Sequence, residues 1–467
     1  MQLAILIAVL AALAQSETTS PQPVDSALWR VTIALAGVSL APLVAAFGSA
    51  SAARALALGR PHNQHSFQRY LQFQRFAIGL WLGGCVFTLY VIEWPLIVRV
   101  NWSLADWLLV DELCILAPVV LPLVLLWGAF YQVERAAQIA IARQTGGVLP
   151  PREAMRYVWL QVRHHLGLIL LPALAVIAVQ DLFARFLPDT AVGDNAWWLC
   201  LPLLVAAYVC LPLVLRGIWR TSSMPAGELR SRLEAECRQR DCSMSDILIW
   251  HTAGHVANAA VAGMTRRLRY VFLTDGLLQR LSHDEITAVV RHELGHITRL
   301  HLPFRMLLLA LPLVLFLALQ SWLPDAVAAV PAWLAAFGIG PSLQSSLLLP
   351  LLVAAYVIVV VGRCSRRLEH DADLAVLCGT DGVPDVKAAE DFLLALERLT
   401  GTGRESRFAE WLHPSLAKRR SFLQRASADD RFRRRFRQRL DRHAWLLVAA
   451  LLTAGAAIAA ASASANL

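Results

Sequence analysis

The stretch that decides how this part of the chain folds is Arg291-His292-Glu293-Leu294-Gly295-His296. Two histidines four residues apart lie one turn apart on the same face of a helix. Their imidazoles can bind one Zn²⁺ ion, and the glutamate beside the first histidine can act on water at that ion. The motif therefore predicts zinc ligands at His292 and His296, and peptide-bond hydrolysis with the help of Glu293.

The residues before the motif predict where its helix begins. Ser282-His283-Asp284-Glu285 has the spacing of a capping box, with Ser282 at the N-cap and Glu285 three residues later. Apolar residues then recur at helical spacing and are expected to face inward; they are Ile286, Val289, Val290, Leu294 and Ile297. The alternative interpretation is a surface helix that happens to contain two histidines.

The composition predicts a protein that crosses a membrane several times. Of the 467 residues, 57% are hydrophobic and only 16% are charged. The net charge of +9 gathers in polar segments beside apolar ones, which favours a lipid bilayer over nucleic acid as the partner. The clearest such segment is 431–442, where seven arginines precede an apolar stretch.

The hydropathy pattern divides the chain into six segments. Residues 1–27 read as a signal peptide or an N-terminal span followed by a polar linker. The others are an N-terminal membrane region at 28–215, the first part of a zinc domain at 216–304, a membrane hairpin at 305–362, the second part of the zinc domain at 363–443, and a last span with a tail at 444–467. We therefore expect a mainly α fold, with a transmembrane helical bundle and an α+β domain resembling the gluzincin peptidases.

About eight spans are predicted, each near the roughly 20 residues that a bilayer requires. They lie at 28–48, 77–98, 107–130, 166–187, 196–215, 305–323, 343–362 and 444–460. Loops rich in arginine alternate with loops that have almost none, and the positive-inside rule places the basic loops in the cytoplasm. The zinc domain is therefore expected at the cytoplasmic face of the inner membrane, and the Arg- and Ala-rich composition favours a bacterial host.

A third metal ligand is expected from the second polar segment. Glu369 and Asp373 are four residues apart on a predicted helix, so that Glu369 can bind the metal and Asp373 can accept a hydrogen bond from a ligand histidine. Two predicted spans separate His296 from Glu369, and an even number of crossings returns the chain to the same membrane face. The alternatives are an acidic helix face that balances nearby arginines, or His370 or Asp371 as the ligand.

Two further segments are candidates for contacts with a substrate. Short β-rich runs on either side of a turn with Gly263 predict a hairpin, whose exposed edge can bind an extended peptide through its main chain. His413-Pro414, followed by Arg419, offers a histidine and an arginine that can stabilise an oxyanion near a zinc site. A capped basic helix explains the second segment equally well.

These pieces, in this order, resemble the family of HtpX-type and type I CAAX prenyl proteases, which are integral-membrane zinc metallopeptidases. The resemblance covers residues 245–425. It includes Asn258-Ala259 with Gly263, the run into Thr274-Asp275-Gly276, the His-Glu-x-x-His motif, Glu369 with Ala372-Asp373, and His413-Pro414 with Arg419. It departs from the family pattern at Leu412, where a threonine is common, and at Ser415, where a second proline is common.

The resemblance implies roles for these residues. His292, His296 and Glu369 would bind one zinc ion, Glu293 would be the general base, and Asp373 would support a ligand. His413 and Arg419 would contact the substrate or the transition state, and Asn258 and Gly263 would belong to the substrate-binding strand. The implied substrate is a polypeptide, and membrane-protein quality control is the expected setting.

Other functions remain open at this stage. An antibiotic-sensor metallopeptidase also places a His-Glu-x-x-His domain between spans, and it uses cleavage as a signal. A site-2-type intramembrane protease fits less well, because the predicted zinc helix is charged and flanked by polar sequence. A membrane scaffold with a vestigial zinc site is the non-enzymatic alternative, and the intact Glu293 argues against it.

Overall fold

The computed structural model describes two compact units of the chain. The residues described are 25–57, 63–105, 107–145, 153–186, 197–252, 256–323, 355–379, 383–400 and 413–465, with the single positions 4, 5, 8, 9, 11, 12, 254, 352 and 353. The first unit is Met1–Val205 with Leu334–Leu351, and the second is Ala206–Trp333 with Leu352–Leu467. The following paragraphs treat each unit by itself.

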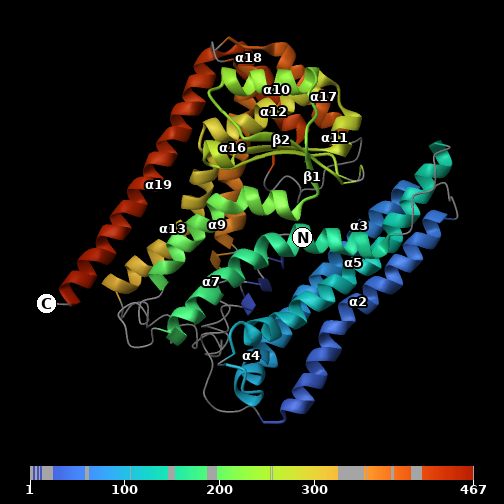
Figure 1. Cartoon of the computed structure of the whole chain (residues 1–467), viewed down its shortest axis with the longest axis vertical. Coiled ribbons are helices and arrows are strands. Elements are labelled where there is room, and N and C mark those ends of the chain that lie inside the picture. Colours follow the sequence, from blue (N-terminus) through green and yellow to red (C-terminus); the bar gives the residue numbers. More distant parts are fainter. Residues whose placement is uncertain are drawn as a thin grey trace. The chain divides into compact units, whose positions relative to one another are not determined.

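The regular secondary structure among the described residues of the first unit is helical (Figure 1). Its helix α2 packs against both α3 and α5. The indole of Trp81 lies in the core of this unit and donates to the main-chain oxygen of Val119, at 2.9 Å. The helical segments, in chain order, are α2 (Ala27–Ala57), α3 (Asn63–Val86), η2 (Phe87–Val91), α4 (Trp94–Leu96), η3 (Ile97–Asn101), α5 (Val110–Thr145), α6 (Ala154–Gln161), η4 (Val162–Leu166) and α7 (Gly167–Phe186); α9 (Trp197–Ile218) leads from this unit into the second.

Several helices are long and apolar enough to cross a membrane. Among the described residues there are four, at Ala27–Leu56, Tyr70–Val91, Val110–Ala136 and Asp430–Ala461, or up to six if two bent helix pairs each count as one span. One bent pair contains α7 and the other contains α13. The predicted helical membrane fold is therefore confirmed, whereas half of the predicted span at 343–362 and most of residues 1–27 lie outside the described residues.

The second unit contains a four-stranded sheet with the order β1-β2-β4-β3. The strands are β1 (Thr221–Ser223), β2 (Asp246–Trp250), β3 (Ala259–Ala262) and β4 (Tyr270–Thr274). Strands β2 and β4 are parallel, while β1 pairs antiparallel with β2 and β3 pairs antiparallel with β4. The predicted hairpin before the motif is β3 and β4, and β3 forms an edge of the sheet.

The turn of this hairpin requires its glycine. Gly263 has φ +119°, a region that residues with a side chain rarely adopt. A Cβ at this position would also lie only 2.2 Å from the main-chain oxygen of Leu268. The short η5 (Arg266–Leu268) then leads into β4.

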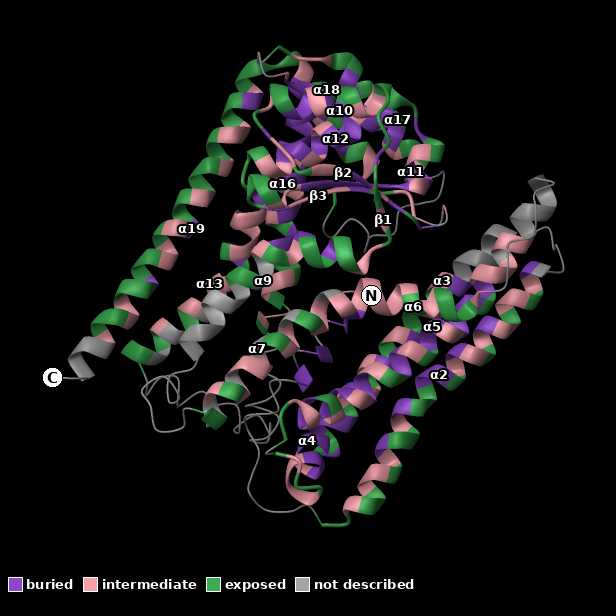
Figure 2. Cartoon of the chain, viewed as in Figure 1, coloured by how far each residue is buried: buried purple, intermediate pink, exposed green. Residues whose placement is uncertain are grey.

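Helix α12 (His283–Thr298) contains the His-Glu-x-x-His motif and begins as the sequence predicts. The main-chain N–H of Ser282 donates to Oε2 of Glu285 at 2.8 Å, and the N–H of Glu285 donates to Oγ of Ser282 at 3.3 Å. Figure 2 shows that much of α12 is buried. The other helices of this part are α10 (Glu228–Gln239), α11 (Asp275–Arg280), α16 (Gly362–Leu377), α17 (Val386–Thr400) and α18 (Leu416–Ala428).

Three further helical segments of this unit directly precede or follow these helices in the sequence, and they contain long apolar stretches. They are α13 (His301–Trp322), η6 (Val357–Val361) and α19 (Asp430–Ala465), and α13 packs against α19. Figure 1 shows α19 extending away from the sheet of this unit. Beyond its basic first turns, α19 exposes apolar side chains such as Trp445, at 73%, as expected of a helix that faces lipid.

Candidate metal centre

Helices α12 and α16 approach each other closely at a glycine. A Cβ at Gly295 would lie 2.8 Å from the Cβ of Ala375 and 3.1 Å from the Cα of Ala372, so only glycine permits this approach. Gly295 lies between the two histidines of the motif, and Ala372 lies one turn after Glu369. Their contact therefore brings the two predicted ligand segments together.

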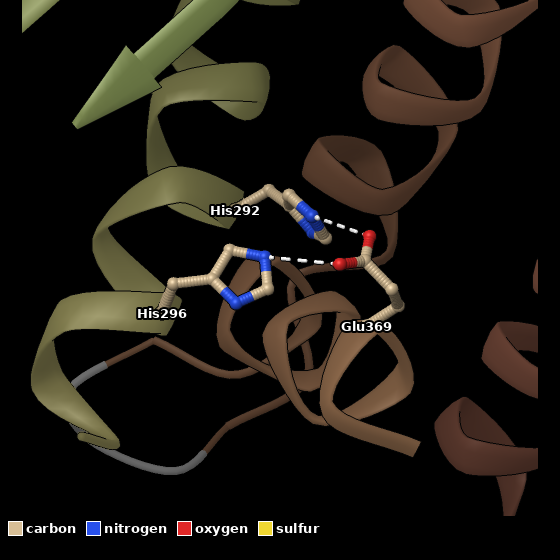
Figure 3. Close-up of side chains that lie close together, drawn as sticks. All are labelled: His292, His296 and Glu369. Carbon is tan, nitrogen blue, oxygen red and sulfur yellow. Dashed lines mark ion pairs between the residues drawn. The ribbon is translucent and has the colours of Figure 1, made fainter. Parts of the chain in front are cut away.

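The three predicted ligands converge on one point (Figure 3). One nitrogen each of His292 and His296 and one oxygen of Glu369 lie within 4.8 Å of one another. Nε2 of His292 is 3.5 Å from Oε2 of Glu369, and Nε2 of His296 is 3.5 Å from Oε1 of the same carboxylate. In both histidines Nε2 is therefore the atom that faces the centre.

The other ring nitrogen of His292 faces Asp373. Nδ1 of His292 is 3.1 Å from Oδ1 of Asp373, which is fully buried. Arg419, also buried, donates from Nε to both oxygens of Asp373 at 3.1 and 3.2 Å. The ring of His292 stacks on Phe392 of α17, with centroids 5.0 Å apart. Asp373 therefore lies where it can accept a hydrogen bond from His292, and Arg419 pairs with Asp373.

The other ring nitrogen of His296 faces a residue that the sequence interpretation did not single out. Nδ1 of His296 is 2.8 Å from Nδ1 of His301, and Nε2 of His301 is 3.0 Å from Oδ2 of Asp371. His301 and Asp371 are both buried.

The carboxylate of Glu369 has two further partners. Nη2 of Arg305, from the first turns of α13, donates to Oε1 at 3.0 Å, and Nδ1 of His413 lies 2.9 Å from Oε2. His413 itself is 62% exposed. His413 therefore reaches the centre from the solvent side.

These neighbours change the pKa values of the centre. Burial opposes a charge on His292, but its hydrogen bonds to Asp373 and Glu369 raise the pKa of His292 to about 9. Burial also opposes a charge on Glu369, yet hydrogen bonds from His292 and His413 hold the pKa of Glu369 well below its usual range. Burial, followed by the neighbouring His292, lowers the pKa of His296. These shifts favour an ionised Glu369 and a neutral His296, which are the forms that bind a metal.

A cavity of about 350 Å³ opens beside these residues. Glu293 and Asn258 line it, and burial raises the pKa of Glu293. The remaining walls are largely apolar. They include Leu277 and Val289 from the side of α11 and α12, and Phe392, Leu396, Leu399 and Leu416 from the side of α17 and α18.

The structure places the predicted site residues in three groups. His292, His296, Glu369 and Asp373 form the centre itself. Asn258, Glu293, His413 and Arg419 line the adjoining cavity, whereas Gly263 forms the hairpin turn and is not among the lining residues. Of the alternative ligands, Asp371 bonds to His301, and His370 stacks on Phe422 with centroids 4.3 Å apart.

The sequence interpretation missed His301 and Arg305. Both belong to the first turns of α13, which follows α12 after a bend of 52° at Leu300, whose φ is +54°. A signal for them exists: they are ionisable residues four apart at the start of a predicted span, and such residues commonly face the protein interior.

Comparison with known proteins agrees with this geometry. Residues 223–427 match the model of peptidase family M48. The protease HtpX of Actinobacillus pleuropneumoniae serotype 5b is 37% identical over 65 residues, which cover 14% of this chain and 22% of the relative. An HtpX homolog from Aeropyrum pernix is 27% identical over 131 residues, or 28% of this chain and 41% of the relative. The chain thus covers less than half of the length of either relative.

Among solved structures, the crystal structure of S. mikatae Ste24p aligns with a TM-score of 0.44 and 14% identity, covering 86% of this chain and all of that one. The family match spans both parts of the metal centre, from the sheet to α18. Residues 223–427 therefore match peptidase family M48 across the whole candidate metal centre, and the resemblance to the HtpX-type and type I CAAX prenyl proteases is confirmed.

Proposed function

We propose that this protein is a zinc-dependent membrane endopeptidase that hydrolyses peptide bonds of polypeptide substrates at the cytoplasmic face of the inner membrane. The single observation that supports this most strongly is the convergence of His292, His296 and Glu369 beside a cavity lined by Glu293. Unfolded or membrane proteins are the proposed substrates, in keeping with a role in membrane-protein quality control.

The residues of the centre fit a zinc ion. Ligands about 2.1 Å from a tetrahedral zinc lie about 3.4 Å from one another. The two distances of 3.5 Å between the Nε2 atoms of the histidines and the oxygens of Glu369 match this spacing. They also exceed ordinary hydrogen-bond lengths. Two imidazoles and one carboxylate are a known set of protein ligands for catalytic zinc. The adjoining cavity leaves room for the water or substrate that takes the fourth position.

The chemistry follows from the residues around the centre. When bound there, zinc supplies Lewis acidity toward the scissile carbonyl and the attacking water. Glu293 takes a proton from that water and later delivers it to the leaving nitrogen. Because its pKa is raised, Glu293 is a stronger base than an ordinary carboxylate, which suits this role.

The substrate backbone is proposed to bind along β3. Within the described residues β3 pairs only with β4, so its outer edge offers main-chain hydrogen bonds to an extended peptide. Asn258 precedes this edge and lines the cavity. A peptide bound along β3 therefore passes Glu293 and the metal ligands.

Arg419 is proposed to act through Asp373 rather than on the substrate. Its guanidinium pairs with the buried Asp373 and lies over the ring of Phe392, at 4.8 Å from the centroid. This arrangement keeps Asp373 ionised and turned toward His292. His413, at the open side of the centre, remains the proposed contact to the transition state.

The test is a substitution of the general base. Glu293→Gln keeps the shape of the side chain and leaves the three ligands in place, but it cannot accept the proton. The purified variant is expected to retain one zinc per chain and to lose about 100-fold or more of its activity on an unfolded protein such as casein.

Two outcomes would argue against the proposal. Full activity of Glu293→Gln would exclude Glu293 as the base, and absence of zinc from the active wild-type protein would exclude a zinc peptidase. His292→Ala serves as the comparison, because it is expected to lose both metal and activity. A wild-type protein that binds zinc without cleaving any polypeptide would instead favour the alternative function, a membrane scaffold with a vestigial zinc site.

A further inference from the structure

His301 of α13 lies directly behind the ligand His296. Its ring is buried and touches His296 on the side away from Glu369, with ring centroids 5.0 Å apart. His301 itself is not a fourth ligand, because its Nδ1 faces Nδ1 of His296 and not the Nε2 atom that points into the centre. Its second nitrogen is 3.0 Å from Asp371.

His296, His301 and Asp371 are joined by two hydrogen bonds. Only one choice of donor and acceptor in these bonds leaves Nε2 of His296 free to bind a metal. A carboxylate can only accept, so Asp371 requires the proton of a neutral His301 to be on Nε2. Nδ1 of His301 is then an acceptor, and Nδ1 of His296 must donate to it. The lone pair of His296 is thereby placed on Nε2, the atom that faces Glu369.

We propose that Asp371 and His301 are positioning residues that fix the tautomer and the orientation of His296, so that the first turn of the membrane helix α13 completes the metal site. This inference rests on the proposed zinc site. It assigns to Asp371 the function for His296 that Asp373 has for His292.

Helix geometry explains why this side of the site needs an intermediate residue. Glu369 and Asp373 are four residues apart on α16 and share a face, so that Asp373 reaches His292 directly. Asp371 is two residues from each of them, about 200° around the helix axis. His301 spans the gap between this second face and His296.

The same turn of α13 also contacts the carboxylate ligand. Arg305 is four residues after His301 and donates to Oε1 of Glu369 at 3.0 Å. Two of the three expected ligands are therefore held by α13. The 52° bend at Leu300 directly precedes the turn of α13 that makes both contacts.

The experiment measures metal binding by the purified full-length protein. We expect His301→Phe, which keeps a flat ring but loses both hydrogen bonds, to weaken zinc binding by about 10- to 100-fold in competition with a chelator. The absorption spectrum of the Co²⁺-loaded protein is expected to change as the ligand field of His296 changes. His301→Gln, whose amide can accept from His296 and donate to Asp371, is expected to restore most of the affinity.

A double-mutant cycle tests whether Asp371 acts through His301. Asp371→Asn is expected to weaken zinc binding by itself, because an amide can donate as well as accept and no longer enforces the tautomer. In the His301→Phe background the same change is expected to have little further effect, because the intermediate residue is gone. His443→Phe, at an exposed histidine of α19, is the matched control and should leave zinc affinity unchanged.

These measurements distinguish failure of the positioning role from failure of the proposed peptidase function. Wild-type zinc affinity in a folded His301→Phe protein, or additive effects in the cycle, would overturn the positioning role even if the protein is an active peptidase. If the wild-type protein binds zinc but cleaves nothing, the peptidase proposal fails while the cycle still tests the positioning role. Thermal unfolding of the metal-free variants shows whether each remains folded.

Discussion

Carboxylate oxygens of Asp373 and Glu369 lie beside the two ring nitrogens of His292 and favour its protonated form in the absence of a metal. Its pKa of about 9 lies above the ordinary value of 6.5 because of the hydrogen bonds to Asp373 and Glu369, which outweigh burial. A proton and a metal ion therefore compete for the same nitrogen. The metal can bind only after that proton has left.

We expect zinc binding to release at least one proton per site at pH 7, and apparent zinc affinity to rise about tenfold per pH unit up to about pH 9. The stability of the metal-free protein has the opposite trend. A raised pKa stabilises the fold fully below pH 6.5, and this contribution is lost as pH rises through about 9. Calorimetric titration in two buffers with different ionisation enthalpies measures the protons released. A value of zero at pH 7 would show that His292 is neutral before the metal binds.

At the scale of elements, the contact between α12 and α16 sets the geometry of the centre. Gly295→Ala places a Cβ 2.8 Å from that of Ala375, so the two helices must move apart. We expect a loss of about 1–3 kcal/mol in stability and weaker zinc binding, because the ligands belong to both helices.

The control for this substitution is Gly455→Ala in α19, where a Cβ would meet nothing within 4 Å. It is expected to leave zinc binding unchanged, because the added methyl group meets no neighbour. Alanine also favours a helix more than glycine does, so α19 is not destabilised. Thermal unfolding and chelator competition on both variants give the comparison. Unchanged zinc affinity in Gly295→Ala would mean that the close approach is not needed to form the centre.

Elements with a strong local signal are predictable from the sequence. The start of α12 follows from hydrogen bonds within four residues, between Ser282 and Glu285, and these are present. The hairpin of β3 and β4 follows from its β-rich runs and Gly263. Strand β1 has only three residues and its pairing with β2 depends on distant sequence, so the sequence interpretation did not include it.

Predictability of the site depends on how far apart its residues lie in the chain. Glu369 is predictable because two predicted membrane crossings would return the chain to the same face and because Glu369 with Ala372-Asp373 matches the family pattern. His301 was missed because its partner Asp371 is 70 residues away and because the bend at Leu300 has no sequence motif. Arg419 was identified, but only the folded chain shows that it contacts Asp373.

At the scale of the whole molecule, the distribution of charge predicts which side of the membrane each segment occupies. Exposed Ser231 lies in the first part of the zinc domain, which is expected in the cytoplasm. Exposed Ala105 lies in a loop with almost no basic residues, which is expected outside.

We expect a cysteine introduced as Ala105→Cys to react with a membrane-impermeant maleimide on intact spheroplasts. Ser231→Cys should react only after the membrane is permeabilised, and the unmodified protein gives the background from its own cysteines. Labelling of Ser231→Cys on intact spheroplasts would place the zinc domain on the outer face and contradict the proposed location.

The left-handed turn at Leu300 has a consequence for how this protein can be divided. It joins α12 to α13, a candidate membrane helix, with almost no linker, and the residues just after it, His301 and Arg305, contact the expected ligands. The candidate membrane helix α13 and the domain with the metal centre therefore cannot be exchanged independently of each other, as domains joined by a flexible linker can. A soluble peptidase made by ending the chain at Thr298 and rejoining it at Gly362 would keep all three expected ligands and still lack part of its metal site.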